Sequence, residues 1–528
     1  MPRPSSFRMI AGYAVTLIAA LALVVGVVQL LQDEVHVERE RVAIGDTPAT
    51  VFRPSEGAAG PVVLLSHGFA GSRPLMDPVA MTLSGNGYTV VSFDYLGHGR
   101  NPNPLYGDIT SQQGAAQALV DQTRRVADFA LGLDESDGRL VLVGHSMATN
   151  IIVRYAQAND SVIATAGISL FAPTVDESTP GNLLSVVGGF ERRLEEEGRR
   201  MVALSTGLEP DEVELNRTYG DFSEGNARRI AVAPGVEHVG VLYSTVTLQE
   251  VLDWTDAAYD RESEGWLAQR GPWIALVLAA TILLGRPVGR ALPRAGPVGG
   301  TGSGAGWRRI AVVAGVPAVL TPLLLAPVPT DFLPVAVGDY VAIHFGVYGL
   351  LMAGLLWMTR EEAAGGQPTL PRASGSDPLR MRLVGFVVGV ATLLGYYTVL
   401  QGVVLDQWVT NFRPVSERIP LILVMMVGTV LYFLADEWLT RGRTAPKGAY
   451  PATKVLFLLS LGGAVALDVD SLFFLIMIVP IIVIFFLVYG FVSRWSYHGT
   501  GHPLVAGIAN GVGLAWALGV TFPMLGGG

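Results

Sequence analysis

The feature that most constrains the fold is a series of uncharged apolar runs, each close to 20 residues long. A helix of about 20 apolar residues crosses the ~30 Å hydrocarbon core of a bilayer, and helices satisfy their own backbone hydrogen bonds in lipid. We predict nine membrane spans. Two of the segments are short, so the predicted count ranges from eight to ten. The predicted spans are residues 9–31, 272–285, 310–328, 332–358, 383–405, 419–438, 455–467, 472–495 and 503–525.

Acidic residues are concentrated between the first two of these spans. Of the 45 acidic residues in the chain, 34 lie between residues 32 and 270, with 18 arginines and no lysine, a formal net charge of −16. So acidic a domain is unlike those that bind nucleic acid, and we expect no nucleic-acid partner. The pattern predicts a transmembrane anchor over residues 1–35, a globular domain over 36–266 and a multi-span domain of about eight helices over 267–528.

Positively charged loop residues predict the orientation in the membrane, because arginine and lysine favour the cytoplasmic side. A cytoplasmic N-terminus places thirteen of them in cytoplasmic loops and only Arg413 and Arg418 outside. We therefore expect an integral protein of the cell or inner membrane, with the globular domain on the outer, periplasmic or extracellular, face. The cytoplasmic residues would be Arg286, Arg290, Arg294, Arg308, Arg309, Arg360, Arg372, Arg380, Arg382, Arg441, Arg443, Lys447 and Lys454.

A serine lies between an aliphatic strand and a helix in the globular domain. The string Gly144-His145-Ser146-Met147-Ala148 follows the apolar run 140–143 and precedes a helix-like stretch. A serine on such a sharp turn has its hydroxyl pushed out of the sheet, where a base can reach it. Small residues flank it because strand and helix backbones come close together. Ser146 is therefore predicted to be a nucleophile.

The remaining catalytic groups are sought downstream of Ser146. Among the histidines of the globular domain only His238 follows the serine, after a short strand and a Pro-Gly loop. Glu191 comes three residues after Gly188 at the end of an apolar strand, and is the predicted acid. Asp176 or Glu177, one strand earlier, remains the alternative.

Two backbone N–H groups are predicted to bind an oxyanion. Residues 62–66 are a buried strand that runs into the glycine-bearing loop His67-Gly68-Phe69-Ala70-Gly71. In folds that hold a nucleophile on a strand-to-helix turn, a loop in this position supplies one amide and the residue after the nucleophile supplies the other. The N–H groups of Phe69 and Met147 are the candidates.

Residues 40–262 resemble the α/β-hydrolase superfamily. The resemblance depends on the HGFAG loop, the segment from Asp94 to Gly99, the GHSMA elbow and the strand before Glu191, with His238 as the last element. It implies a doubly wound, mostly parallel sheet and a Ser146–Glu191–His238 triad. The match departs from many relatives in one respect, since only about ten residues separate Phe171 from the next strand, where relatives insert a helical cap. We therefore expect no large cap and an open site.

Three functions remain open at this point. The first is a membrane-embedded serine hydrolase that cleaves an ester or related acyl bond of a lipophilic or membrane-resident substrate at the bilayer. The second is an acyltransferase with the same triad, and the third is a transporter or sensor with a non-catalytic hydrolase-like domain. The chain has no cysteine, no Walker motif and no H-E-x-x-H motif, so we expect no cofactor and no metal. The oligomeric state is not predicted.

Asp339 and His344 are the deepest ionisable residues of the predicted spans. Ionisable groups within lipid are costly and often functional, so these two could form an intramembrane polar site. Their five-residue separation does not place them on one helix face.

Overall fold

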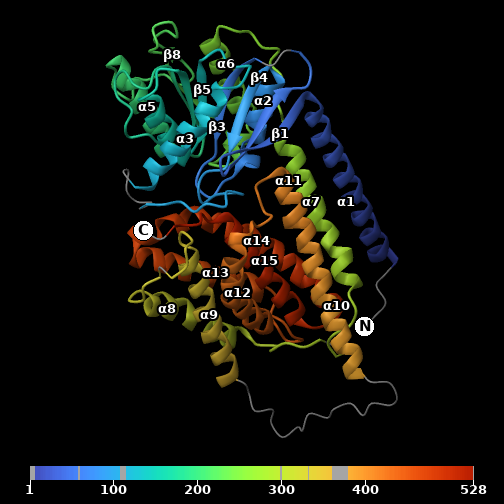
Figure 1. The fold of residues 1–528 in the computed structure, drawn as a ribbon. Coiled ribbons are helices and arrows are strands. Elements are labelled where there is room, and N and C mark those ends of the chain that lie inside the picture. Colours follow the sequence, from blue (N-terminus) through green and yellow to red (C-terminus); the bar gives the residue numbers. More distant parts are fainter. Residues whose placement is uncertain are drawn as a thin grey trace. The chain divides into compact units, whose positions relative to one another are not determined.

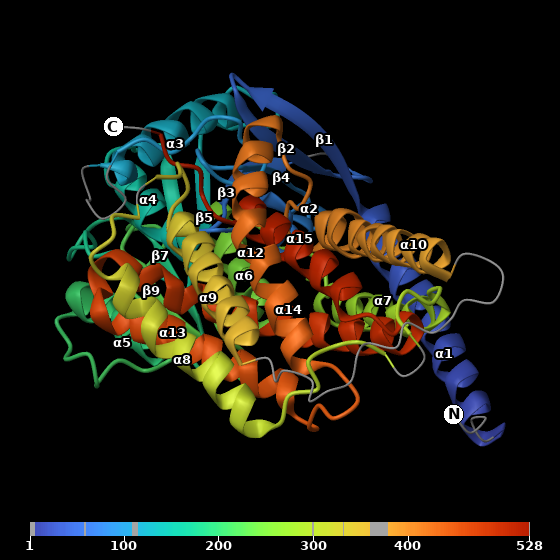
Figure 2. The ribbon, with the colours of Figure 1, turned by 90° about the horizontal axis from the view of Figure 1, so that it is seen from below.

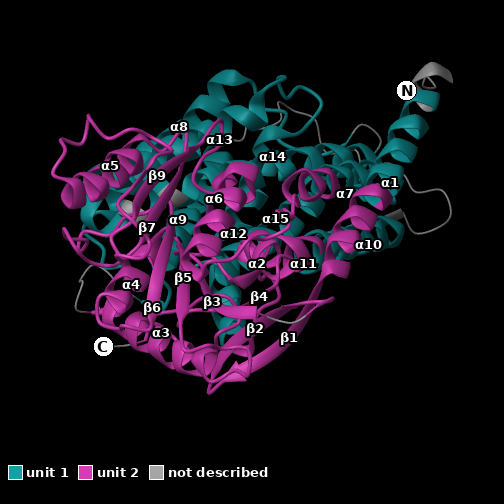
Figure 3. Cartoon of the chain, turned by 90° about the horizontal axis from the view of Figure 1, so that it is seen from above, with its two compact units in different colours: residues 1–23, 278–403, 417–522 teal, residues 24–277, 404–416, 523–528 magenta. Residues whose placement is uncertain are grey.

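The computed structural model describes residues 6–57, 60–107, 114–297, 300–330, 332–359 and 378–526. The chain divides into two compact units, coloured in Figure 3. Unit 1 comprises residues 1–23, 278–403 and 417–522, and unit 2 comprises residues 24–277, 404–416 and 523–528. Two short segments, 404–416 and the end of the chain, thus belong to unit 2 although the predicted boundaries place them in the multi-span domain.

Within the described part of unit 2, nine strands form one sheet in the order β1-β2-β4-β3-β5-β6-β7-β9-β8. Figure 1 labels several of these strands. Neighbours from β4 to β9 pair in parallel, and the strands at both edges pair antiparallel. This mostly parallel sheet confirms the predicted fold class. The strands are β1 Val37–Ile44, β2 Thr47–Pro54, β3 Gly60–Ser66, β4 Tyr88–Phe93, β5 Leu140–His145, β6 Val162–Ile168, β7 Leu183–Gly188, β8 Thr218–Tyr219 and β9 Arg228–Ala233.

Helices cover both faces of the sheet. Side chains of β3 alternate, so that Val63 and Leu65 pack in one core with residues of α2 (Asp77–Gly85) and α6 (Thr245–Tyr259). Val62 and Leu64 pack in the opposite core with α3 (Ala115–Leu131) and α4 (Met147–Ala156). Each buried aliphatic side chain contributes roughly 1.5–3 kcal/mol, and burial on both faces accounts for the continuous apolar runs of these strands.

The segment between β6 and β7 contains no helix. All residues from 169 to 182 are described and lie in turns or extended backbone. Helix α5 (Arg192–Thr206) follows β7 and packs through Met201 against a third cluster. The carboxyl end of β6 therefore carries a short connection without a helical cap, as expected. The short 3₁₀ helices of unit 2 are η1 Glu34–His36, η2 Arg73–Met76 and η3 Gly240–Tyr243.

Unit 1 is helical, and α1 and α7 are divided between the two units. Within the described ranges, nine helices are long and apolar enough to cross a membrane, in agreement with the predicted spans. The two short predicted spans belong to longer helices, α7 and α13. The long helices are α1 Ser6–Asp33, α7 Gly271–Ala291, α8 Trp307–Leu325, α9 Gly338–Met358, α10 Pro378–Val399, α12 Ile419–Thr440, α13 Ala449–Leu467, α14 Val469–Thr500 and α15 Pro503–Thr521.

Glycines allow close helix packing in unit 1. Helix α12 packs against both α9 and α15 (Figure 2). A Cβ on Gly349 of α9 would lie 2.6 Å from the backbone nitrogen of Tyr432, and one on Gly511 of α15 would lie 2.5 Å from the Cα of Val430. Small residues at such contacts let helix backbones approach, which is a main source of helix association in lipid.

Several cations that the sequence analysis assigned to loops lie in helices: Arg286 and Arg290 in α7, Arg308 and Arg309 in α8, and Arg380 and Arg382 in α10. Lys454 lies inside α13 and is buried, and Arg418 is buried and donates to the carbonyls of Gly519 and Phe522. Arg360 and Arg372 lie outside the described residues. The orientation depends on the other loop cations and stays a prediction. A π-helical turn, Leu400–Leu405, joins α10 to the short α11 (Asp406–Trp408), and η5 (Ser416–Arg418) precedes α12.

Candidate active site

Ser146 lies on the predicted sharp turn between β5 and α4. Its backbone has φ 55° and ψ −119°, a sparsely populated conformation that persists only where the surroundings impose it. A Cβ on Gly144 would lie 2.9 Å from Ile152 Cδ1 and 3.2 Å from the Ala148 Cβ. The requirement for small residues at the elbow is therefore steric, and Ala148 satisfies it.

The structure brings together the three predicted catalytic side chains. Ser146 Oγ lies 2.8 Å from His238 Nε2, and His238 Nδ1 lies 2.5 Å from Glu191 Oε1. The His238 side chain is 32% exposed and that of Glu191 only 7% exposed. Ser146 follows β5, Glu191 follows β7 and His238 follows β9, so parallel strands deliver all three groups to one edge of the sheet. This geometry allows a proton to pass from Ser146 to His238.

The Glu191 carboxylate has three donors. Its Oε2 atom accepts hydrogen bonds from Ser169 Oγ at 2.8 Å and from the Gly188 N–H at 2.6 Å. Burial opposes ionisation of this carboxyl, but the hydrogen bonds from His238, Gly188 and Ser169 lower its pKa below the ordinary value. An ionised Glu191 can hold the proton of His238 on Nδ1 and leave Nε2 free to accept from Ser146.

His145 positions the loop that carries His238. Its Nε2 atom lies 2.8 Å from the His238 carbonyl oxygen. Burial, with the nearby charge of His238, lowers the pKa of His145 to about 3, so its ring is neutral and can donate this bond. Glu237 holds the following turn by accepting from the N–H groups of Val239 and Gly240 at 2.8 Å each. The sequence placed His145 in the elbow, but its contact with His238 depends on the fold.

Asp176, the alternative acid, is engaged in a local turn. Its carboxylate accepts from the backbone and hydroxyl groups of Ser178 and Thr179 at 2.7–3.2 Å. Hydrogen bonds from Thr179 and Ser178 lower the pKa of Asp176 to about 2. Glu177 is exposed. The carboxylate that accepts from His238 Nδ1 is that of Glu191.

The candidate oxyanion-hole residues lie beside the nucleophile. Met147 is the first residue of α4, where helix N–H groups lack partners within the helix. Phe69 lies between β3 and η2, next to Gly68, where a Cβ would lie 2.9 Å from the Ser146 Cβ. The loop backbone therefore passes directly against the elbow. The oxyanion hole and the catalytic roles of the three side chains stay predictions.

Asp94 anchors the end of this loop. Its side chain is fully buried, with Oδ1 accepting from the Arg73 N–H at 2.9 Å and Oδ2 accepting from Arg73 Nε at 3.1 Å. His67, at the other end of the loop, has Nδ1 2.8 Å from the Gly68 carbonyl oxygen and accepts at Nε2 from the Tyr95 N–H at 3.1 Å. These buried polar contacts connect the loop to the end of β4.

Residues 57–204 match the family model described as serine aminopeptidase, S33. This match, the sheet and the elbow agree on the α/β hydrolase fold. Unit 2 contains an α/β hydrolase domain. Two uncharacterized proteins of Mycobacterium tuberculosis strains are each 30% identical over 106 residues, which are 20% of this chain and 34% of the relative. The chain thus spans about a third of the length of these relatives.

Two of the solved structures that are similar to this chain are hydrolases. A Vigna radiata epoxide hydrolase mutant is 26% identical, with a TM-score of 0.22, over 27% of this chain and 41% of that chain. A dienelactone hydrolase from Anabaena variabilis is 16% identical, with a TM-score of 0.32, over 42% of this chain and 97% of that chain.

The predicted intramembrane residues of unit 1 have separate surroundings. Both ring nitrogens of His344 face hydroxyl groups, Nε2 at 3.0 Å from Ser460 Oγ and Nδ1 at 3.4 Å from the Tyr340 hydroxyl. Asp339 lies in the first turn of α9, where its carboxylate accepts from the Tyr340 N–H at 2.7 Å. Within the described ranges no group of three histidine or acidic residues could hold a metal ion. A polar site made jointly by Asp339 and His344 stays a prediction.

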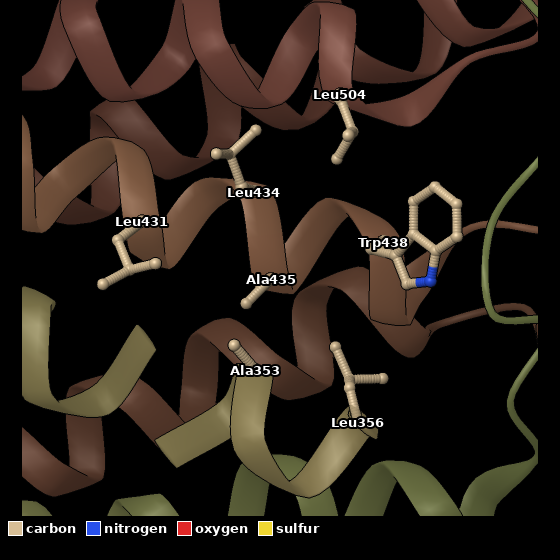
Figure 4. A pocket seen from close by; sticks show the side chains of 7 residues that line it. All are labelled: Ala353, Leu356, Leu431, Leu434, Ala435, Trp438 and Leu504. Atoms are coloured by element: carbon tan, nitrogen blue, oxygen red, sulfur yellow. The ribbon is translucent and has the colours of Figure 1, made fainter. Parts of the chain in front are cut away.

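A buried ion pair elsewhere in unit 1 escaped the sequence analysis. Lys454 Nζ lies 2.5 Å from Asp436 Oδ2, and Thr453 donates to Asp436 Oδ1 at 2.6 Å. A hollow of about 250 Å³ on the same helix, α12, is lined only by apolar and aromatic side chains, shown in Figure 4. The lining residues are Ala353, Leu356, Leu431, Leu434, Ala435, Trp438 and Leu504.

Proposed function

We propose that this protein is a membrane-embedded serine hydrolase that cleaves an ester or related acyl bond of a lipophilic substrate. The observation that carries the proposal is the unbroken hydrogen-bonded relay from Ser146 Oγ through His238 to Glu191. A serine hydroxyl is a weak nucleophile unless a base removes its proton, and the base needs a third group to hold its ring.

The proposed reaction has two halves. Ser146 Oγ attacks the substrate carbonyl carbon while His238 takes the hydroxyl proton, and the amides of Phe69 and Met147 bind the oxyanion. The bond to the leaving alcohol then breaks, and His238 gives that alcohol its proton. Water next loses a proton to His238 and attacks the acyl-enzyme, which releases the acid and restores Ser146.

Exposed apolar side chains around the relay support a lipophilic substrate. Phe171 after β6 is 57% exposed, Phe190 beside Glu191 is 72% exposed, and Val239 beside His238 is 42% exposed. Each lies next to a residue or strand end that forms the site. Exposed apolar groups gathered at one place are typical of ligand or membrane contact surfaces, and an acyl chain would cover them.

Peptide hydrolysis is a second candidate, favoured by the serine aminopeptidase description of the matching family. It uses the same nucleophile with an amine as leaving group. Acyl transfer, in which an alcohol replaces water, remains the alternative on the same relay. A transporter or sensor with an inert hydrolase domain would need none of the relay.

The test compares full-length protein in detergent or nanodiscs on p-nitrophenyl esters of increasing chain length and on aminoacyl p-nitroanilides. Ser146→Ala and His238→Ala are each expected to lower ester turnover about 10⁶-fold, with little further loss when combined, because triad members act as a unit. Thr149→Ser, which keeps a hydroxyl near the elbow, serves as the folded control. Turnover that survives Ser146→Ala, or that is confined to anilides, would contradict an esterase.

A further inference from the structure

Residues 404–416 include the end of one candidate membrane span and the first residue of the next, yet they belong to the hydrolase unit. Four residues of this segment are buried, Val404 at 5% exposure, Asp406 and Asn411 at 6% and Phe412 at 4%. Burial of two polar side chains requires hydrogen-bond partners. These partners lie beside residues 67–73, called the oxyanion loop here because they include Phe69, whose N–H is a predicted oxyanion donor.

Asn411 contacts Ser72, near the end of the loop, and Asp94, which binds Arg73 there. Its Nδ2 atom donates to Asp94 Oδ2 at 3.1 Å, and its backbone N–H donates to Ser72 Oγ at 2.8 Å. Thr410 Oγ1 is 2.6 Å from the same Ser72 oxygen. Asp94 in turn accepts from Arg73, so Ser72 and Arg73 are both held directly or through Asp94 by residues 410–411.

Asp406 shapes this segment and connects it to Asp94 a second time. Its Oδ1 atom accepts from the N–H groups of Phe412 and Arg413 at 2.9 and 2.8 Å, which folds residues 406–413 into a turn. Arg100 Nη2 donates to both carboxylate oxygens at 3.0 and 2.8 Å, and the Arg100 N–H donates to Asp94 Oδ2 at 3.1 Å. Together with the peptide bond between Asn411 and Phe412, these contacts form a closed ring through Asp94, Arg100, Asp406, Phe412 and Asn411.

The oxyanion loop contains a residue in an unfavourable backbone conformation. Ala70, next to Phe69, has φ 55°, a left-handed conformation that costs a non-glycine residue free energy. Strand β3 precedes the loop, and η2 with α2 follows it. Contacts at Ser72 and Arg73, where the loop enters η2, therefore help to hold the Phe69 N–H in one direction.

We propose that Asn411 and Asp406 are positioning residues for the oxyanion loop, so that the part of the chain between two membrane spans completes the hydrolase site. They touch no reacting atom and act through Ser72, Arg73 and Asp94. The inference rests on the proposed function for its catalytic consequence. Its structural consequence, a loop 67–73 held by residues 406–411, stands independently of which bond is cleaved.

The test uses full-length Asn411→Asp, which sets a carboxylate against the buried Asp94 carboxylate, and the milder Asn411→Ala. Removal of an oxyanion donor lowers kcat about 10²–10³-fold, and we expect a displaced donor to lower kcat ~10–100-fold with KM almost unchanged. Gln407→Asp is the matched control, because Gln407 is an exposed amide in the same segment. In a double-variant cycle, Asp94→Asn combined with Asn411→Asp should lose less than the sum of the two single losses.

Hydrogen exchange separates this inference from the proposed function. Peptides covering residues 67–76 should exchange faster in Asn411→Asp and Asn411→Ala than in wild type or Gln407→Asp, whether or not any substrate is turned over. Unchanged exchange would overturn the inference, as would a rise in KM with kcat unchanged. Absence of all ester and peptide turnover in wild type, with exchange altered as expected, would overturn the proposed function alone.

Discussion

Replacement of Glu191 by glutamine tests the assignment of the acid in the relay. In the wild-type structure Oε2 accepts from Gly188 and Ser169, and Oε1 accepts from His238 Nδ1. A glutamine amide can keep its oxygen on Gly188 and Ser169, since both are donors. Its NH₂ group then faces His238 Nδ1 and can only donate to it.

This reversal disables the base. A donor opposite Nδ1 favours the tautomer whose proton is on Nε2, 2.8 Å from Ser146 Oγ, where it blocks proton transfer from the serine. The equivalent acid-to-amide change in a serine-protease triad lowers kcat about 10⁴-fold, which corresponds to about 5.4 kcal/mol of transition-state stabilisation. We expect a loss of this order for Glu191→Gln, smaller than that for Ser146→Ala.

The assay is turnover of a short p-nitrophenyl ester by purified full-length protein, with thermal stability as the check on folding. Stability should change by less than about 1 kcal/mol, because the two bonds to Oε2 are retained. Asp176→Asn is the control, and its turnover should stay within about twofold of wild type because its contacts are local and exposed. A damaging Asp176→Asn with a silent Glu191→Gln would refute the reasoning.

Three further predictions concern stability, topology and specificity. Burial lowers the pKa of His145 to about 3 from its ordinary 6.5, so this site's contribution to folding stability is complete above pH 6.5 and is lost by about 1.4 kcal/mol per pH unit as pH falls toward 3. His145→Gln keeps a donor for the His238 carbonyl, and its melting temperature should fall less steeply with acid than that of wild type, whereas parallel slopes would assign the effect to other groups. In intact cells a Lys447→Cys thiol should resist an impermeant maleimide until permeabilisation while a Ser136→Cys thiol reacts at once, and the opposite pattern would invert the orientation. Phe190→Ser should lower kcat/KM for long-chain esters more than for short ones, and equal losses would remove Phe190 from the acyl-chain surface.

Much of the hydrolase site was predictable because its signals are local. Ser146 is preceded by four aliphatic residues and followed by a helix, and Glu191 and His238 each come just after a short apolar strand. In a parallel sheet the carboxyl ends of all strands meet at one edge, so the order of strands alone was sufficient to bring the three side chains together. The choice of Glu191 over Asp176 stayed open in the sequence because both follow strands.

Contacts between distant segments were not predictable in the same way. Asn411 and Asp94 are separated by 317 residues, and no periodicity or motif connects them. The segment 406–413, which mixes polar and aromatic residues between two predicted spans, resembles an ordinary membrane loop. Lys454 illustrates a related limit, since a cation near a span end resembles a loop residue until its partner Asp436 is placed beside it.

Covalent labelling tests the central claim most directly, because a fluorophosphonate reacts only with a serine whose proton is removed by a base. Purified full-length protein should bind close to one probe per chain, on the peptide that contains Ser146. Labelling should disappear in Ser146→Ala and slow strongly in His238→Ala, with Thr149→Ser labelled like wild type. Folded wild-type protein that takes up no probe, or a probe found on another serine, would contradict the account.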